Sequence, residues 1–208
     1  MVRMAILAGL LLLPSASISI AHELGTPLST NSTQDTTPAL SSVAREEKAR
    51  TYFTDLPVIA QDGKERRFFS DVLKDKIVLI NLFYTNCTSI CPVLNQRISG
   101  VQDLLGARLG SDITLISITT DPARDLPSVV KTYSQSFNPR EGWLFLTGRT
   151  QDIQTIVRRL GHTSSDPADH VALLLIGDVG RAKWTKLKPT ASETEIAAML
   201  EILLSERN

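Results

Sequence analysis

The sequence predicts an α/β fold in which a buried β-sheet is covered by helices. Nearly continuous apolar runs at residues 77–84 and 113–118 are typical of strands that are buried on both faces. After the first run, apolar residues recur at helical spacing, as in Leu94, Ile98, Val101, Leu104 and Leu105. Alternating strands and helices of this kind give a layered α/β sandwich.

The alternation continues to the end of the chain. Helices are expected around residues 126–137 and 153–160, and strands at residues 143–146, 171–176 and 183–187. Asp121-Pro122 and Asp125 are candidate starts for the first of these helices, and Ser192 with Glu195 predicts a capping box at the last helix. Gln61-Asp62-Gly63 predicts an early hairpin. This order is that of a thioredoxin-like core with an N-terminal hairpin extension and a middle insertion.

The first fifty residues predict a signal peptide and a linker. Arg3 precedes a short apolar run, and Ser19-Ile20-Ala21 has small residues where a signal peptidase cuts, so residues 1–21 are expected to be removed. An uncleaved anchor facing the periplasm is the alternative. Residues 22–50 are rich in Ser, Thr and Pro, which predicts a flexible linker. The folded domain is therefore expected at residues 51–208, in the periplasm, where thiol pairs can oxidise.

Composition narrows the possible partners. The chain has 22 basic and 22 acidic residues, so its net charge gives no reason to expect nucleic acid as a partner. Only two cysteines are present, which excludes a disulfide-rich scaffold.

Those two cysteines, Cys87 and Cys91, are the strongest candidates for chemistry. They fall where a central strand is expected to lead into a helix, and their spacing predicts that both sulfurs lie on one face of the first helical turn. Helix N–H groups stabilise anionic sulfur there, so at least one thiol is expected to have a lowered pKa. A static disulfide, thiol–disulfide exchange and a soft-metal site are all compatible with the cysteines alone.

His170 favours the metal site. It stands in Asp166-Pro167-Ala168-Asp169-His170, directly before an expected strand. In thioredoxin-like folds the loop before the equivalent strand faces the cysteine helix, and disulfide oxidoreductases usually carry a proline beside that strand. Here the nearest proline is Pro167. Two thiolates and one imidazole suit three-coordinate Cu(I), whereas zinc prefers a fourth ligand. Asp169 is a candidate to orient His170, or to form the turn.

At this point the chain resembles the Sco/SenC family of copper chaperones for cytochrome oxidase assembly, from about Tyr52 to Leu204. The resemblance is carried by three motifs: Phe83-Tyr84-Thr85-Asn86-Cys87 with Cys91-Pro92, Thr119-Thr120-Asp121-Pro122-Ala123-Arg124-Asp125, and Asp169-His170. It implies that Cys87, Cys91 and His170 bind copper as Cu(I), with Cu(II) as a second candidate. Asn86 replaces a histidine of many members, and Thr88-Ser89 replaces Pro-Asp. Neither position is a ligand in the family.

The resemblance also implies a function. The chain would be a periplasmic metallochaperone that delivers copper to the dinuclear copper centre of cytochrome c oxidase. Its partners would be the copper-bearing oxidase subunit and a periplasmic thiol reductant or copper donor, with no small-molecule substrate. The alternative is a thiol–disulfide oxidoreductase in which Cys87 and Cys91 are a redox-active pair that reduces the cysteines of an oxidase subunit or another exported partner. A copper or redox sensor is a third interpretation.

Other residues are weaker candidates. His22 would become the first residue after cleavage, where its imidazole and the terminal amine can chelate Cu(II), although an accidental position in a flexible tail is the simpler interpretation. His162 is expected at a helix end. Lys183, Lys186 and Lys188 are interpreted as a solvated strand edge rather than a docking face. A thiol peroxidase is disfavoured because Tyr84 and Ile80 stand where that class needs Thr or Ser and Pro.

Overall fold

The structure is a computed structural model that describes residues 41–164, 166 and 172–207, all of which belong to one compact unit. The predicted signal peptide at residues 1–21 and the linker up to residue 40 lie outside the described residues. In chain order, the elements are α1 (Ser42–Phe53), β1 (Pro57–Ala60), β2 (Glu65–Arg67), the π-helical turn η1 (Phe68–Leu73), β3 (Ile77–Phe83), α2 (Ile90–Leu105), the short 3₁₀ turn η2 (Gly106–Arg108), β4 (Ile113–Thr119), α3 (Pro127–Gln135), β5 (Trp143–Thr147), α4 (Thr150–Arg159), β6 (Leu174–Asp178), β7 (Lys183–Lys186) and α5 (Glu193–Ser205).

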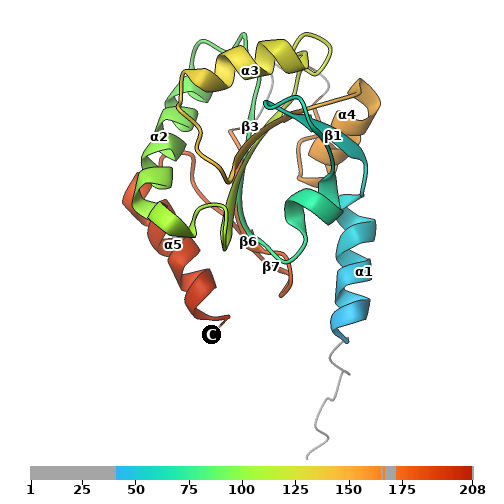
Figure 1. Ribbon diagram of the computed structural model, residues 1–208, viewed down its shortest axis with the longest axis vertical. Coiled ribbons are helices and arrows are strands. Elements are labelled where there is room, and N and C mark those ends of the chain that lie inside the picture. Colours follow the sequence, from blue (N-terminus) through green and yellow to red (C-terminus); the bar gives the residue numbers. More distant parts are fainter. Residues whose placement is uncertain (1–40, 165, 167–171, 208) are drawn as a thin grey trace, which may run out of the picture. The chain divides into compact units, whose positions relative to one another are not determined.

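The strands of the described residues form a seven-stranded sheet in the order β2-β1-β5-β4-β3-β6-β7 (Figure 1). Strands β3, β4 and β5 are parallel, and β6 and β7 continue the sheet in antiparallel fashion beside β3. The predicted β1–β2 hairpin adds the opposite edge, with Gly63 in the left-handed region at its turn. This arrangement confirms the predicted thioredoxin-like α/β class, with α3, β5 and α4 between β4 and β6.

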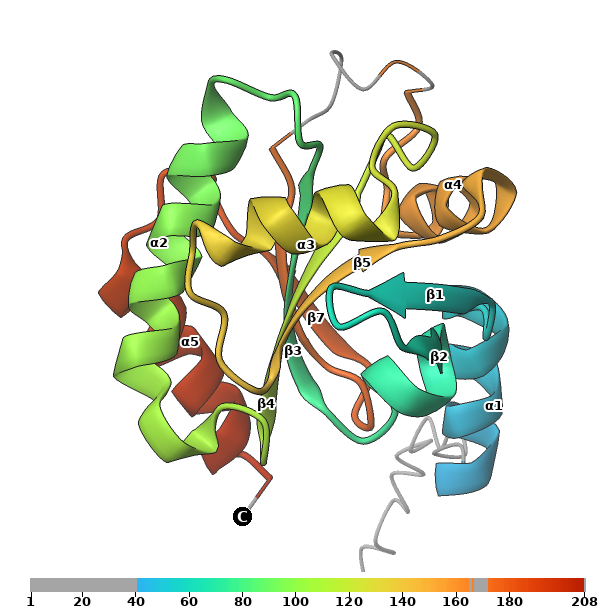
Figure 2. The ribbon, with the colours of Figure 1, turned by 45° about the horizontal axis from the view of Figure 1, so that its top comes forward.

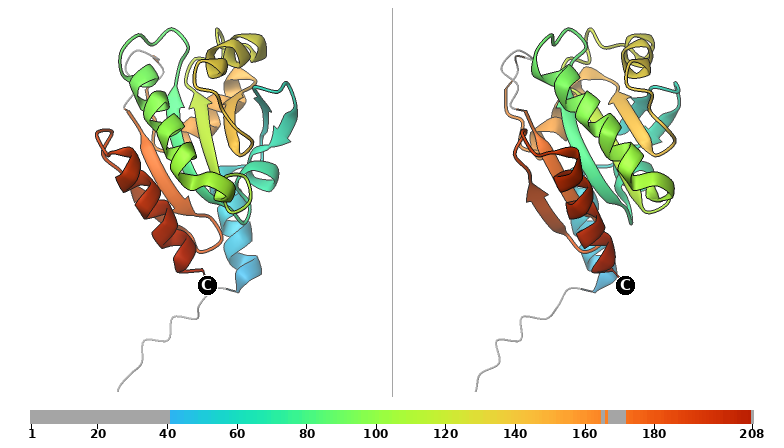
Figure 3. Two further views of the ribbon diagram at one scale, coloured as in Figure 1. Left: turned by 60° about the vertical axis from the view of Figure 1, so that its left-hand side comes forward. Right: turned by 90° about the vertical axis from the view of Figure 1, so that its left-hand side faces the viewer.

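Helices cover both faces of the sheet. Helices α2 and α5 lie side by side over one face, and α1 and α4 lie over the other (Figures 1 and 3). Successive residues of β3 point to opposite faces, so Leu79 and Phe83 enter the core beneath α2, whereas Ile80 and Leu82 enter the core beneath α1 and α4. Burial on both sides explains why every residue of this strand except Asn81 is apolar.

The predicted linker is wrong over its last residues, because α1 begins at Ser42 rather than after residue 50. The Ser41 hydroxyl caps this helix by accepting the N–H of Ala44. At the other end, Phe53 is buried and Arg50 forms an ion pair with Asp55 at 2.7 Å. The helix is mostly polar, so tertiary contacts at its C-terminal end hold it rather than a broad apolar face. A helix of this kind cannot be distinguished from a linker by its composition.

Several predicted boundaries also shift. Helix α3 begins at Pro127, after both candidate starts at Asp121 and Asp125. Strand β6 begins at Leu174, later than the expected residue 171. Leu104 of α2 is exposed, although the predicted apolar stripe includes it. The capping box between Ser192 and Glu195 is confirmed. In the part of the chain that the structure describes, we find no helix with the length and apolar character of a membrane span.

Candidate metal centre

The two cysteines lie where β3 leads into α2. Cys87 stands in the loop between these elements, and Cys91 occupies the first turn of the helix. Both side chains are buried and both are thiols rather than a disulfide. The loop lies at the carboxyl end of the parallel strands, at the top of the molecule in Figure 2. Ligand sites of open α/β sheets are commonly found at this edge.

The predicted placement of both sulfurs within the first helical turn is wrong in detail. Helix α2 begins at Ile90 after Ser89, so Cys87 precedes the helix. Its sulfur nevertheless accepts the backbone N–H of Cys91 over 3.3 Å and lies 3.9 Å from the Ser89 hydroxyl oxygen. Because the first N–H groups of a helix have no partner within the helix, the Cys87 sulfur acts as a capping acceptor. The expected contact between an anionic sulfur and the helix start is therefore present.

The two thiols differ in acidity. Burial alone would raise the pKa of Cys87, but hydrogen bonds from Cys91 and Ser89 outweigh burial and lower it. Burial raises the pKa of Cys91 to about 12, and its hydrogen bond to Cys87 adds to that rise. Cys87 is therefore the thiol that ionises first, and Cys91 is a buried donor behind it.

Asp125 fixes the cysteine loop through hydrogen bonds. This carboxylate is buried and accepts hydrogen bonds from the backbone N–H and the hydroxyl of Thr85 and from the hydroxyl of Thr119. Burial raises its pKa, although these hydrogen bonds oppose the rise. Thr85 is two residues before Cys87, so Asp125 ties the cysteine loop to the end of β4. From its sequence Asp125 is predicted as a helix start, and this role in fixing the loop is not foreseen, although the residue closes the Thr119–Asp125 motif.

A buried chain of hydrogen bonds runs beneath α2. Asn95, one turn after Cys91, donates to the hydroxyl of Tyr133 at 3.1 Å and accepts from the amide of Asn81 at 2.9 Å. Ser117 donates to Asn81 at 2.6 Å and accepts from the indole N–H of Trp143 at 3.0 Å. The Tyr133 ring also stacks on Phe83, with ring centroids 5.1 Å apart. Satisfied polar networks of this kind fix one arrangement of the elements that they join, here α2, α3 and three strands.

An open groove of about 800 Å³ passes beside Cys87. It runs between α2 and α3, and its walls include Thr88, Val93 and Tyr133. Val93 is about half exposed. The groove gives a partner protein a route to the Cys87 sulfur, although the cysteine itself is largely covered.

His170, the predicted third ligand, lies outside the described residues, as do Asp169 and His22. In the described parts of the chain, no group of three or more His, Cys, Asp or Glu side chains is arranged so that it could hold a metal ion. The residues on either side of the segment 167–171 are described. Leu174 pairs with Asn81 of antiparallel β3, so the chain enters β6 at the sheet end where β3 leads to the cysteines (Figure 2).

Asp166 marks the other end of this segment and lies in the same region. The pKa of Tyr84 is raised by burial, by Cys87 and, more weakly, by the charge of Asp166. Both described ends of the segment therefore lie near the cysteine loop.

The remaining sequence candidates follow α4 or lie on and just after β7. His162 is buried just after α4, as expected for a residue at a helix end, and its backbone N–H donates to Val157. Lys183 is exposed and pairs with Glu206 at 2.6 Å. Lys186 and Lys188 are also exposed, in keeping with a solvated strand edge.

Comparison with known proteins gives the class of this chain. The sequence model of the SCO1/SenC family matches residues 46–204, so the chain belongs to the SCO1/SenC family. A SCO2-like protein of Rickettsia felis is 35% identical over 102 residues, which are 49% of this chain and 47% of that protein. The SCO1 protein homolog of Bacillus subtilis is 34% identical over 92 residues, covering 44% and 46% of the two chains. The matched part thus spans about half the length of these relatives.

Solved structures support the same fold. ScoI of Bradyrhizobium japonicum, determined with copper bound, superposes with a TM-score of 0.60 at 28% identity and covers 70% of this chain and 95% of its own. A SCO1/SenC family lipoprotein from Bacillus anthracis superposes with a TM-score of 0.62 at 22% identity and covers 72% and 92%. The second likeness concerns the fold alone.

Proposed function

We propose that this chain is an exported copper-binding chaperone that delivers copper to the copper-bearing subunit of cytochrome c oxidase. In this proposal residues 1–21 direct export to the periplasm, and Cys87, Cys91 and His170 hold the metal. Membership of the SCO1/SenC family and similarity to a copper-bound relative support copper as the cargo. Soft thiolates favour Cu(I) over harder cations, and an added imidazole extends the site to Cu(II).

The observation that carries the proposal is the contact between the Cys87 sulfur and the N–H of Cys91. The thiol of lowered pKa thus lies directly before a helix, and the second thiol lies in the first turn of that helix. Metal binding deprotonates the thiols, so the ionised Cys87 is the natural first ligand and Cys91 loses its proton as the metal arrives. The positions of Asp166 and Leu174 support a histidine ligand from the segment between them, because both flank the cysteine loop.

The same asymmetry favours one alternative function. A thiol of lowered pKa beside a buried thiol of raised pKa suits thiol–disulfide exchange, in which the first attacks a partner disulfide and the second resolves the mixed disulfide. The alternative is a reductase of the cysteines of an oxidase subunit or another exported protein.

His170→Ala separates the two functions. The variant loses one proposed copper ligand and keeps both thiols, so we expect weakened copper binding, most severely for Cu(II), with thiol exchange unchanged. Copper content of the reduced protein, thiol exchange rate and oxidase activity are measured in cells that carry only the variant. Failed oxidase assembly with normal exchange supports the chaperone. Normal assembly with no bound copper supports the reductase.

His22→Ala is the matched control for this experiment. It removes a histidine that the chaperone proposal does not use. Loss of copper in His22→Ala but not in His170→Ala would move the site to the mature N-terminus and contradict the proposal.

A further inference from the structure

A second cavity lies on the opposite face of the sheet from the cysteines. It measures about 500 Å³ and is bounded by α1, the end of α4 and the β6–β7 hairpin. Cavities of roughly 300–1,000 Å³ are the size that holds small organic ligands. The metal site and the buried hydrogen-bond chain belong to the other core, so nothing in the proposed copper function uses this cavity.

The interior of the cavity is apolar and partly aromatic. Phe53 and Trp184 form one wall, with ring centroids 4.9 Å apart. Leu160, Leu175 and Val179 supply aliphatic surface. The Trp184 ring lies directly over Gly177, where an added Cβ would come within 2.2 Å of it, so the absence of a side chain at Gly177 sets the position of this wall.

The mouth of the cavity is cationic. Arg45, Lys48, Ala49 and Tyr52 line it from α1 at helical spacing, so they share one face of that helix. Arg159 adds a third cation from the end of α4, and its carbonyl accepts the hydroxyl of Tyr52 at 3.0 Å. Among the described lining residues there are three basic side chains and no acidic one.

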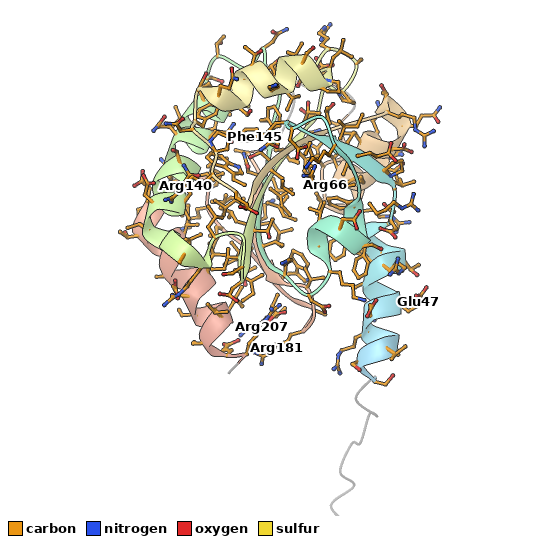
Figure 4. The ribbon with its side chains drawn as sticks, viewed as in Figure 1. Glu47, Arg66, Arg140, Phe145, Arg181 and Arg207 are labelled. Atoms are coloured by element: carbon orange, nitrogen blue, oxygen red, sulfur yellow. The ribbon has the colours of Figure 1, made fainter. Side chains whose placement is uncertain are left out.

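The acidic residues of α1 are directed elsewhere. Glu46 pairs with Lys74 at 2.8 Å. Glu47 points away from the sheet in Figure 4. An apolar cavity with basic side chains at its entrance is complementary to a molecule with a hydrocarbon body and one anionic end.

We propose that this cavity binds a free long-chain carboxylate, with its chain against Phe53 and Trp184 and its carboxylate at Lys48 and Arg159. The carboxylate forms charge-assisted hydrogen bonds at the mouth, and the chain removes apolar surface from water. The proposal is independent of copper binding, because the cavity and the cysteines lie in different cores.

Dodecanoate is a suitable probe below its micelle concentration, and Trp184 is the reporter. Trp143 is buried in the other core, so a ligand-dependent change in tryptophan fluorescence or in acrylamide quenching is assigned to Trp184. We expect saturable binding of dodecanoate and at least tenfold weaker binding of dodecan-1-ol, which has the same chain without the charge. Absence of saturable binding, or equal binding of the two probes, overturns the proposal.

Matched variants locate the site. Ala49→Phe fills the cavity from α1, and Thr51→Phe places the same ring on an exposed part of that helix. Lys48→Gln with Arg159→Gln removes two charges at the mouth. Arg158→Gln with Lys131→Gln removes two exposed charges that do not line the cavity. We expect Ala49→Phe and the double variant Lys48→Gln, Arg159→Gln to weaken dodecanoate binding at least tenfold. The two control variants should bind dodecanoate as well as the unmodified protein does. Circular dichroism confirms that all four variants are folded.

Other occupants give different results. If the protein binds anionic phospholipid vesicles but not monomeric dodecanoate, the face docks on membranes and the proposal is wrong. It is also wrong if Ala49→Phe abolishes a dimer detected by sedimentation, because a second copy then fills the cavity. Charge variants that bind dodecanoate as well as the unmodified protein does would likewise contradict it.

Discussion

The backbone N–H of Cys91 donates to the sulfur of Cys87 over 3.3 Å, which makes the two cysteines chemically unequal. Cys87 precedes α2 and receives hydrogen bonds that favour its thiolate. Cys91 is enclosed in the first turn, where burial favours its thiol. Any chemistry at this pair, metal binding or exchange, therefore begins at Cys87.

We predict that Cys87 is alkylated much faster than Cys91. In a Cys91→Ala variant the remaining Cys87 keeps the hydrogen bond from the backbone of residue 91, and in a Cys87→Ala variant Cys91 stays buried. With metal removed by chelation, iodoacetamide is expected to modify Cys87 at least about tenfold faster near neutral pH, because only the thiolate reacts. The pH at which the alkylation rate is half-maximal should lie below about 8.5, the pKa of a free cysteine, for Cys87 and above about 8.5 for Cys91. Equal rates and pH profiles would show that the helix start does not distinguish the thiols.

The cysteine pair could be found from sequence because its signal is local. An apolar strand, two cysteines at helical spacing and an amphipathic helix specify the strand, the helix and the site between them. Asp125 could not be assigned in this way. It contacts Thr85, which is 40 residues away in the chain, and only the parallel pairing of β3 with β4 brings them together. Helix α1 was missed for a related reason, since its stabilising contacts with Asp55 and Ser70 lie outside its own sequence.

A second prediction concerns the ion pair that fixes the C-terminus of the domain. Arg207 holds both oxygens of the buried Asp178 at 2.7 Å, and Arg181 adds its backbone N–H at 3.1 Å. Figure 4 shows Arg207 and Arg181 close together beyond α5. Arg207→Gln leaves a buried carboxylate without its main partner, so we expect the free energy of unfolding to fall by about 1–3 kcal/mol at neutral pH. Urea titration measures this. Arg158→Gln, at an exposed position, is the control and should change stability by less than about 0.5 kcal/mol.

The effect of Arg207→Gln should depend on pH. Burial opposes ionisation of Asp178, but the hydrogen bonds from Arg207 and Arg181 outweigh it and lower the pKa of this carboxyl group. A lowered pKa in the folded state stabilises the protein above the unfolded value of about 3.9, and this stabilisation disappears as the pH falls through the folded pKa. The difference in stability between the unmodified protein and the variant should therefore shrink on acidification. A difference that stays constant down to low pH would mean that the pair does not couple ionisation to folding.

Gly177 and Trp184 give a third prediction. They are paired on adjacent strands, and a Cβ at residue 177 would come within 2.2 Å of the indole ring. We expect Gly177→Ala to lower the free energy of unfolding by about 1–3 kcal/mol, because the ring must leave its place against Phe53. Gly180→Ala is the control, since its nearest atom would be 3.6 Å away. In a Trp184→Ala background the cost of Gly177→Ala should fall by at least about 0.5 kcal/mol. Equal costs in both backgrounds would rule out the clash as the cause.

The last prediction is that oxidation of the cysteine pair prevents copper binding. The sulfur of Cys87 lies 3.3 Å from the backbone nitrogen of Cys91, so we expect the two cysteines to form a disulfide with only a local adjustment of the loop before α2. A disulfide joins the two sulfur atoms covalently, so neither remains as a thiolate that could bind a soft metal. We therefore expect the oxidised protein to bind Cu(I) at least tenfold more weakly than the reduced protein, a difference of about 1.4 kcal/mol.

Competition with a Cu(I) chelator measures this difference in affinity, with the redox state of each sample confirmed by mass after alkylation. A Cys87→Ser, Cys91→Ser double variant is the control and should give the same low affinity before and after oxidation. The chain has no other cysteine, so no second disulfide can produce the effect. Equal copper affinity in the oxidised and reduced unmodified protein would place the metal on ligands other than this pair. It would thereby remove the chemical basis for copper delivery by Cys87 and Cys91.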